Sequence, residues 1–413
     1  MKRCFATIVS PNYLAYARVL GQSLARHEAA ASFRVLVVGR PDDAVTRAFE
    51  DAGLAFTFAT DLGLADFEQL AFRFDLLELN TALKPTFLKQ LFAQGFDQVI
   101  YLDPDIAVYA PLTPVAEALD EAQTVVIPHT LAPVMDGKRP SDIDFLRSGT
   151  FNLGFVGFRR GPDSFALLDW WERRCLAWGF NDQGFGTFVD QKWMDLAPCY
   201  FDGVQVLKHP GCNVAYWNLH ERAVRREGDA YAVKDHALVF FHFSGVDATQ
   251  PGILSRHQNR HDIVPGTALA QLVQDYCARL GAADHLRWSP VPYPFGRLDD
   301  GTEITPAMRR AACLTSMDSA HAFEAKSPLQ RALRDAGLTQ AAASNYAKAT
   351  TLNFDASDVR VTWVNRLLRF MARIAGVERM SALLRYATFL TWQSNSAAVL
   401  LDKPFDLEHR DRR

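Results

Sequence analysis

Hydrophobic residues over the first 262 positions follow two patterns, short apolar runs and longer stretches with helical spacing. Apolar runs cover residues 4–10 and 33–39, and a stretch of helical spacing covers residues 12–27 between them. Buried parallel strands form continuous apolar runs, whereas amphipathic helices place apolar residues three and four positions apart. Strand, helix and strand at this rhythm predict a parallel βαβ unit.

The alternation of strand and helix patterns continues along the chain. Further strands are expected at residues 54–58, 98–102, 124–130, 151–160, 204–207 and 237–245, and further helices at 42–52, 84–95 and 164–180. Alternating elements of this kind predict an α/β fold with a mostly parallel mixed sheet.

Three regions are expected along the chain. Residues 1–262 form the α/β domain, and residues 263–345 a helical accessory region with a Pro-rich linker at 288–301. Residues 346–413 are expected to form a C-terminal amphipathic helical region. The length of 413 residues agrees with two or three folding units, because domains usually hold roughly 100–200 residues.

Composition narrows the class of partner. A hydrophobic content of 49% with 22% charged residues is typical of soluble globular proteins. The net charge of −3 argues against a nucleic-acid partner, which usually needs a basic excess, and favours a small molecule or a carbohydrate. The six cysteines form no Cys-x-x-Cys pair, and neither a secretory signal nor an apolar run of 18 residues is evident. We therefore expect a cytoplasmic protein; nothing in the sequence indicates its oligomeric state.

Two carboxylates follow the apolar run at 98–102. Asp103 and Asp105 stand one residue apart, at the carboxyl end of an expected inner strand. Open α/β sheets bind their ligands at this edge, so the pair is a candidate metal site. The alternative is an ordinary turn, because Asp and Pro are both common where strands end.

Four motifs in order decide between these interpretations. The chain carries YLDPDIAVYAPL from residue 101, FNLGFVGF from 151, VDQKWMD at 189–195 and FFHFSG at 240–245. This set resembles retaining glycosyltransferases of the GT-A fold, specifically family 8, which includes glycogenin and bacterial lipopolysaccharide galactosyl- and glucosyltransferases. The resemblance covers about residues 1–262 and implies a GT-A (Rossmann-like) catalytic domain with a helical C-terminal extension.

The resemblance implies a metal centre. Asp103, Asp105 and His242 match its ligands, with Mn²⁺ or Mg²⁺ as the expected ion, and Asp103 would also touch the donor. A hard divalent cation neutralises the leaving diphosphate. Gly245 would let the backbone approach the phosphates. Taken alone, His242 could equally be a structural histidine of the interior.

The resemblance also implies the residues around the donor sugar. Asp190 and Gln191 match the family's Asp-Gln pair beside the anomeric carbon, where a carboxylate or amide oxygen can stabilise an oxocarbenium-like centre. Asn152 and Gly154 match its Asn-x-Gly, and His129 stands where a sugar-hydroxyl contact is expected. The alternative for Asp190 is a helix N-cap.

The first strand and the loop after it are similar to the family's nucleotide-binding segment. Thr7, Val9, Asn12 and Tyr13 are the expected wall of the nucleotide site. The resemblance implies UDP as the nucleotide. Ser10 departs from the family's pattern, because it stands where the family usually has an acidic residue that hydrogen-bonds uracil.

A second departure concerns the diphosphate. The family's Lys-Pro-Trp is replaced by residues 248–250, which are Ala, Thr and Gln. Lys84 or Arg256 is the expected replacement cation in the donor site. Either could instead be an ordinary surface charge.

The C-terminal region contains a basic amphipathic segment. Arg366, Arg369 and Arg373 share one helical face, and Leu367 and Phe370 lie on another. Such a helix could lie on the anionic inner face of a membrane, where lipid-linked acceptors are found. The alternative is that it packs on its own catalytic domain.

The sequence therefore predicts a metal-dependent retaining glycosyltransferase. It would move a hexose from a nucleotide diphosphate sugar to a glycan or a lipid-linked acceptor. One alternative is an inverting GT-A enzyme with Asp190 as the general base. Another is a non-catalytic nucleotide-sugar-binding or scaffold protein, although Asp103, Asp105, His242 and Asp190 are all present.

Overall fold

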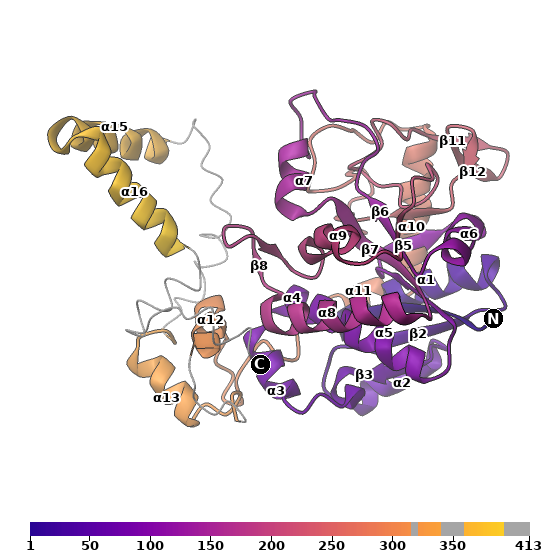
Figure 1. The fold of residues 1–413 in the computed structure, drawn as a ribbon, viewed down its shortest axis with the longest axis horizontal. Coiled ribbons are helices and arrows are strands. Elements are labelled where there is room, and N and C mark those ends of the chain that lie inside the picture. Colours follow the sequence, from indigo (N-terminus) through magenta and orange to yellow (C-terminus); the bar gives the residue numbers. More distant parts are fainter. Residues whose placement is uncertain (315–320, 340–358, 392–413) are drawn as a thin grey trace. The chain divides into compact units, whose positions relative to one another are not determined.

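The computed structural model describes residues 1–314, 321–339 and 359–391. The chain divides into two compact units, Met1–Ala65 with Leu76–Pro294 and Asp66–Asp75 with Phe295–Arg413. Figure 1 shows the course of the described chain. The predicted boundary near residue 262 stays a prediction, and the boundary near residue 345 lies outside the described residues.

A seven-stranded sheet forms the centre of the first unit (Figure 1). Its order is β10-β6-β7-β4-β1-β2-β3, and β7 runs antiparallel to its neighbours β4 and β6 while the other pairs are parallel. The predicted α/β class with a mostly parallel mixed sheet is thus confirmed. The strands are β1 (Arg3–Val9), β2 (Ser32–Val37), β3 (Phe56–Phe58), β4 (Gln98–Leu102), β6 (Thr124–Pro128), β7 (Phe151–Arg159) and β10 (Val204–Val206).

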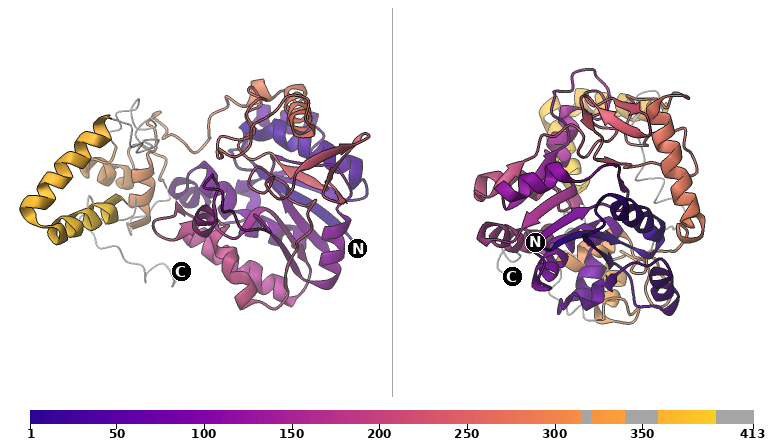
Figure 2. Two further views of the ribbon diagram at one scale, coloured as in Figure 1. Left: turned by 90° about the horizontal axis from the view of Figure 1, so that it is seen from above. Right: turned by 90° about the vertical axis from the view of Figure 1, so that its right-hand side faces the viewer.

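Helices cover both faces of the sheet (Figure 2). Successive side chains of a strand point to opposite faces, so β4 contributes to two cores. Ile100 packs with Leu20 of α1 and Leu119 of α6 on one face. Tyr101 faces the other side and lies under Lys84 of α5. The helices of this unit are α1 (Leu14–His27), α2 (Asp43–Asp51), α4 (Leu76–Ala82), α5 (Lys84–Ala93), α6 (Thr113–Glu121), α7 (Asp142–Ser148), α8 (Pro162–Trp178), α9 (Ala197–Tyr200), α10 (Ala268–Ala282) and α11 (His285–Trp288).

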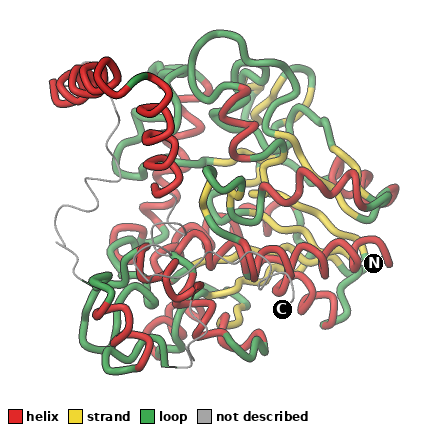
Figure 3. The backbone as a smooth tube through the Cα atoms, turned by 60° about the vertical axis from the view of Figure 1, so that its left-hand side comes forward, coloured by secondary structure: helices red, strands yellow, loops and turns green. Residues whose placement is uncertain are grey.

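A small antiparallel pair begins just after β4 and is separate from the large sheet. The pair consists of β5 (Ile106–Val108) and β14 (Phe240–His242), with His242 opposite Ile106. The strand expected at residues 237–245 therefore does not join the large sheet, because its partner is the short strand after the Asp-x-Asp turn. Figure 3 colours the described chain by helices, strands and loops. The remaining short strands are β8 (Asn181–Asp182), β9 (Thr187–Phe188), β11 (Val224–Glu227), β12 (Ala230–Val233) and β13 (His236–Ala237).

The second unit is helical in its described part, as expected for the C-terminal extension. Its core joins Phe72 of α3 to Met308 of α12 and Leu329 of α13. No helix of the described residues combines the length and the apolar character needed to cross a membrane. The helices are α3 (Phe67–Arg73), α12 (Pro306–Leu314), α13 (Pro328–Asp335), α15 (Val359–Ala375) and α16 (Val377–Thr391).

Candidate active site

The two carboxylates after β4 meet the histidine at the end of β14. His242 Nε2 lies 2.9 Å from Asp105 Oδ1 and 3.8 Å from Asp103 Oδ2. One ligand atom from each residue lies within 4.8 Å of the other two. His242 is buried, while both carboxylates retain partial exposure. The three residues predicted as metal ligands are therefore brought together at the carboxyl end of β4.

Neighbouring strands fix this turn. Tyr101 donates its hydroxyl hydrogen to Asp103 Oδ1 at 2.7 Å, and the Asp103 N–H donates to the carbonyl of Gly154 at 2.7 Å. An ideal Cβ on Gly154 would lie only 2.4 Å from His242 Cε1. The glycine is required here because β7 passes directly against the imidazole ring.

Electrostatics at this turn favour a cation. Burial raises the pKa of Asp103, and the charge of Asp105 raises it further against the opposing effects of Lys84 and His242. Burial by itself would lower the pKa of His242, but the hydrogen bond and charge of Asp105 and the charge of Asp103 leave it raised. Two carboxylates and an imidazole are suitable ligands for a hard divalent ion, which would relieve the repulsion between the carboxylates. The residues therefore fit the predicted metal.

Asp190 forms a buried ion pair with Lys84. Its Oδ2 lies 2.6 Å from Lys84 Nζ, and both side chains are 2% exposed. Lys84 also donates to the carbonyl of Leu153 at 2.8 Å, and Trp171 Nε1 donates to the carbonyl of Asp190 at 3.0 Å. Burial raises the pKa of Asp190, although the charge of Lys84 opposes this. The helix that follows begins at Lys192 after Gln191, so Asp190 is not its N-cap.

Lys84 thus differs from the free cation that its sequence position suggested. Its ammonium group is fully buried between Asp190, the Leu153 carbonyl and the face of Tyr101, whose centroid is 4.1 Å away. A lysine held in this way positions Asp190. Its contact with a donor stays a prediction.

Gln191 and Asn152 connect Asp190 with the metal ligands. Gln191 Oε1 accepts from the Leu153 N–H at 3.0 Å and lies 3.5 Å from Asn152 Nδ2. Asn152 Oδ1 lies 3.2 Å from His242 Nδ1. The three residues predicted to be catalytic, Asp190, Gln191 and Asn152, therefore share one buried cluster with the metal ligand His242.

His129 follows β6 and is also buried. Its Nδ1 lies 3.2 Å from the carbonyl of Thr150, and its ring stacks on Phe145 and meets the edge of Trp217. Burial lowers its pKa to about 4. His129 is therefore neutral near pH 7; its predicted contact with a sugar stays a prediction.

The predicted nucleotide wall is only partly accessible. Thr7 and Val9 are buried within β1, whereas Tyr13 is 37% exposed. Burial raises the pKa of Tyr13, and the negative charge of Asp105 raises it further while Arg256 opposes this. Tyr13 thus lies within electrostatic reach of the metal ligands. Asn12 accepts a 2.6 Å hydrogen bond from the Ser10 hydroxyl, as part of the same turn.

Arg256 lies on the exposed loop after β14. Its N–H donates to the carbonyl of Gly245 at 3.4 Å, and its Nε donates to His257 Nε2 at 3.3 Å. Gly245 has φ of +74°, and an ideal Cβ there would lie 2.5 Å from Ser255 Oγ, so the turn requires glycine. Arg256 therefore sits beside the glycine predicted to approach the phosphates.

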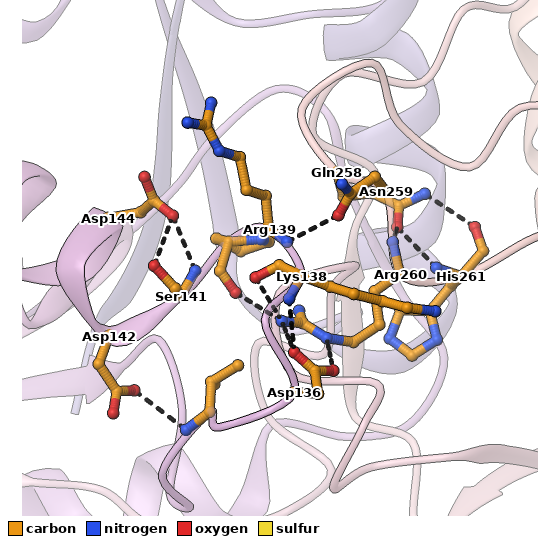
Figure 4. Close-up of polar contacts among 12 residues, drawn as sticks. Asp136, Lys138, Arg139, Ser141, Asp142, Asp144, Gln258, Asn259, Arg260 and His261 are labelled. Atoms are coloured by element: carbon orange, nitrogen blue, oxygen red, sulfur yellow. Dashed lines mark hydrogen bonds and ion pairs between the residues drawn. The ribbon is translucent and has the colours of Figure 1, made fainter.

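A clasp of polar contacts holds the loop of Arg256 in place (Figure 4). Arg260 forms a bidentate pair with Asp136, with distances of 2.6 and 3.0 Å, and donates to the carbonyl of Pro140 at 2.7 Å. The Arg139 N–H donates to Asn259 Oδ1 at 2.7 Å. The hydrogen bond from Arg260 holds the pKa of Asp136 well below its usual value. The clasp joins residues 259 and 260 of this loop to residues 136–140.

Three residues of the cluster were not identified from the sequence. Tyr101 stands two positions before Asp103, and the alternation of the strand could have indicated that it points to the side of Lys84. Asn213 and Trp217 contact Asn152 and His242 from a segment without regular structure. No periodic signal marks such positions.

Comparisons with known proteins give distant likenesses. The chain is 27% identical over 167 residues to an uncharacterised protein of Bacillus subtilis, YfnD. The match covers 40% of this chain and 52% of that protein, so it spans about half the length of the relative. No protein-family model matches the chain.

Among solved structures, the galactosyltransferase LgtC with donor and acceptor sugar analogues has 15% identity and a TM-score of 0.40, covering 67% of this chain and 95% of LgtC. Mouse xyloside xylosyltransferase 1 has 15% identity and a TM-score of 0.36, covering 59% of this chain and 97% of that protein. The glycosyltransferase GlyE of Streptococcus pneumoniae has 14% identity and a TM-score of 0.39, and the match covers 70% of this chain and 64% of GlyE. Likeness at this level of identity concerns the fold alone.

Proposed function

We propose that this protein is a metal-dependent glycosyltransferase that moves a hexose from a nucleotide diphosphate sugar, UDP being the expected nucleotide, with retention of configuration. The observation that carries the proposal is the joint cluster of Asp103, Asp105 and His242 with Asp190, Gln191 and Asn152. A cation-binding face and a buried carboxylate next to it are what a diphosphate leaving group and a positive sugar centre require.

Asp103, Asp105 and His242 would hold Mn²⁺ or Mg²⁺, which when bound supplies positive charge for the diphosphate. The chain itself orients these ligands through Tyr101 and Gly154. The charges of Asp105 and Arg256 both act on the Tyr13 hydroxyl, which supports a site for the base and the phosphates near these residues. The placement of these groups supports donor binding at the carboxyl end of β4.

Asp190 is suited to stabilise positive charge, because the ammonium group of Lys84 favours the ionised form of its carboxylate and opposes the rise in pKa that burial causes. Its carboxylate is already engaged by Lys84 at 2.6 Å, in surroundings that exclude water. A carboxylate fixed in this way costs little reorganisation when charge develops beside it. We therefore favour retention over the inverting alternative, in which Asp190 would be the general base.

We further propose a glycan or lipid-linked acceptor and peripheral contact with the inner face of a membrane. Residues 359–391 hold six arginines and one glutamate. Trp363, Phe370 and Ile374 of α15 are 67%, 58% and 72% exposed. Basic residues together with exposed aromatic and aliphatic side chains favour binding to anionic lipid.

The membrane proposal has a direct test. The protein should sediment with vesicles of anionic lipid and not with vesicles of neutral lipid, and a variant with Phe370→Glu and Ile374→Glu should remain in the supernatant. If these side chains instead pack on the protein itself, the variant would lose stability and the wild type would not sediment.

The enzymatic proposal is tested by incubating the protein with a panel of nucleotide sugars and Mn²⁺ and measuring released nucleoside diphosphate. We expect slow release from one donor, and NMR of the product of a transfer reaction should show the anomeric configuration of the donor. An inverted product would support the inverting alternative. Donor binding without release or transfer for the whole panel would support the non-catalytic alternative.

A further inference from the structure

Val189, the residue immediately before Asp190, has a left-handed backbone. Its φ is +43°, and its side chain is buried. A positive φ is uncommon for any residue other than glycine, and for a β-branched residue it is a clear outlier. Such a conformation costs free energy and persists only where the surrounding structure imposes it.

Two hydrogen bonds impose the turn at Val189. The hairpin of β8 and β9 ends just before this residue, whose N–H donates to the carbonyl of Phe180 at 3.0 Å. One residue further on, the carbonyl of Asp190 accepts from Trp171 Nε1 of α8 at 3.0 Å. Because consecutive residues are held by two different elements, the change in chain direction falls on Val189.

The bond between Trp171 and Asp190 satisfies two buried groups at once. Trp171 is fully buried, so its indole N–H needs a partner inside the protein. Asp190 is also buried, and its backbone carbonyl needs a donor for the same reason. Each group therefore depends on the other, and phenylalanine in place of Trp171 would leave the carbonyl without its donor.

The turn fixes the base of the Asp190 side chain, while Lys84 contacts its tip. An aspartate side chain has few rotatable bonds, so the position of its carboxylate follows closely from its backbone. The ammonium group of Lys84 lies 2.6 Å from the carboxylate, but a lysine stem is flexible and could follow a carboxylate that moved. The backbone of Asp190 therefore decides where the charge lies.

We propose that Val189 and Trp171 are positioning residues that hold the backbone of Asp190 and thereby fix its carboxylate beside the donor sugar. The use of that fixed charge rests on the proposed function, whereas the turn is a property of the chain itself. Charge that is already in place stabilises a transition state without reorganisation, which offsets the strain at Val189. Neither positioning residue touches the substrate in this role.

Glycine and alanine at residue 189 test the strain. Val189→Ala keeps the left-handed cost and Val189→Gly removes it, so the urea midpoint of Val189→Gly should be at least as high as that of Val189→Ala. Val125, which is buried within β6, is the matched control. There glycine should unfold at less urea than alanine. The same order at residue 189 would overturn the role of Val189.

A double-mutant cycle tests the link to Asp190 without any activity. Urea unfolding is measured for Trp171→Phe, Lys84→Met and the variant with both changes. Both single changes act on Asp190, so the double variant should lose less stability than the sum of the two single losses. The control cycle uses Trp170→Phe, also on α8, whose ring meets Tyr200 instead, and it should be additive. An additive cycle for Trp171 would overturn its role.

Steady-state kinetics separate positioning from packing. Trp171→Phe and Val189→Gly should each lower kcat about tenfold and leave the donor KM within about twofold, because a misplaced charge is felt in the transition state. Trp170→Phe should change neither quantity. A merely structural role would not lower kcat in Val189→Gly, which is expected to keep its stability. A normal kcat in either variant would overturn the role of that residue.

The outcomes distinguish this inference from the proposed function. A wild type that turns over no donor would count against the proposed function, and the glycine–alanine comparison and the cycle would still decide the turn. An active wild type with a normal kcat in both variants would overturn the positioning and leave the proposed function intact.

Discussion

The carboxylate of Asp190 and the ammonium group of Lys84 lie 2.6 Å apart, and each side chain is 2% exposed. The pair joins the first residue of the Asp-Gln motif to the first residue of α5, which is 106 positions earlier in the chain. Removing one partner of a buried pair leaves an uncompensated charge. The pair therefore links the stability of the domain to the geometry of the candidate site.

Replacing Lys84 by Met should destabilise the protein by about 3 kcal/mol or more, because Asp190 would be left buried and unpaired. Urea unfolding measures this loss. The double variant Lys84→Met with Asp190→Leu should recover most of it. If Lys84 instead served only as a diphosphate contact, Lys84→Met would weaken donor binding and leave the unfolding midpoint unchanged.

Replacing Asp190 by Asn keeps the shape of the side chain and removes its charge. We expect turnover to fall by about a hundredfold or more while the donor Kd changes little, because charge stabilisation is felt mainly in the transition state. Steady-state kinetics and calorimetry separate the two quantities. The control is Asp169→Asn on α8, whose side chain is 57% exposed and pairs with Lys89. Near-normal turnover in Asp190→Asn would exclude this residue from the reaction.

Activity should require the predicted metal. Excess chelator should abolish transfer, and Mn²⁺, or Mg²⁺ less effectively, should restore it. Asp105→Asn and His242→Ala should each lose metal-dependent donor binding in calorimetry. Asp247→Asn, a change at an exposed carboxylate of the loop after β14, is the control. Full activity in chelator would leave Asp103 and Asp105 as an ordinary turn.

Gly154 should not tolerate a side chain, because the imidazole of His242 lies directly against it. An added methyl group would overlap the imidazole, so Gly154→Ala should weaken Mn²⁺ binding at least about tenfold by displacing a ligand. Gly157→Ala on the same strand is the matched control, because its Cβ would meet Leu119 Cδ1 at 3.3 Å, away from the site. Equal Mn²⁺ affinities in the two variants would contradict this assignment.

Local patterns in the sequence predicted most of the sheet. The strand predicted at residues 98–102 has the same first and last residues as β4. The helix predicted at 84–95 is α5, which ends two residues earlier, at Ala93. Both elements bury continuous or periodic apolar residues, which is the signal that such patterns report. The short strand β5 was missed, because three residues after a turn give no detectable period.

The candidate site was predictable only where its residues lie in motifs. Asp103 could be found because it follows an apolar strand, and His242 because it ends one. The partner of Lys84 depends on tertiary packing that brings α5 to Asp190. Sequence position suggested an accessible cation, and tertiary packing buried it. Asn213 has φ of +55° in an irregular segment, so neither periodicity nor spacing could identify its contact with Asn152.

The buried His129 should lower the free energy of unfolding at acid pH. Burial lowers its folded-state pKa to about 4, whereas a histidine in the unfolded chain has a pKa near 6.5. Between these values the unfolded chain binds more protons, so the contribution of His129 to stability is complete above about pH 6.5, falls progressively as the pH drops toward 4, and is lost below about 4. The difference of about 2.5 in pKa corresponds to about 3 kcal/mol.

Urea unfolding of wild type and His129→Asn at a series of pH values tests this effect. The difference in unfolding free energy between the two proteins should shrink as the pH falls from about 6.5 to 4, because only the wild type must keep a neutral imidazole buried. Subtracting the two curves removes contributions that other titrating groups make to both. NMR titration of His129 should give a midpoint near 4. A midpoint near 6.5, with a constant difference between the curves, would mean that the ring is accessible to water and free to accept a proton.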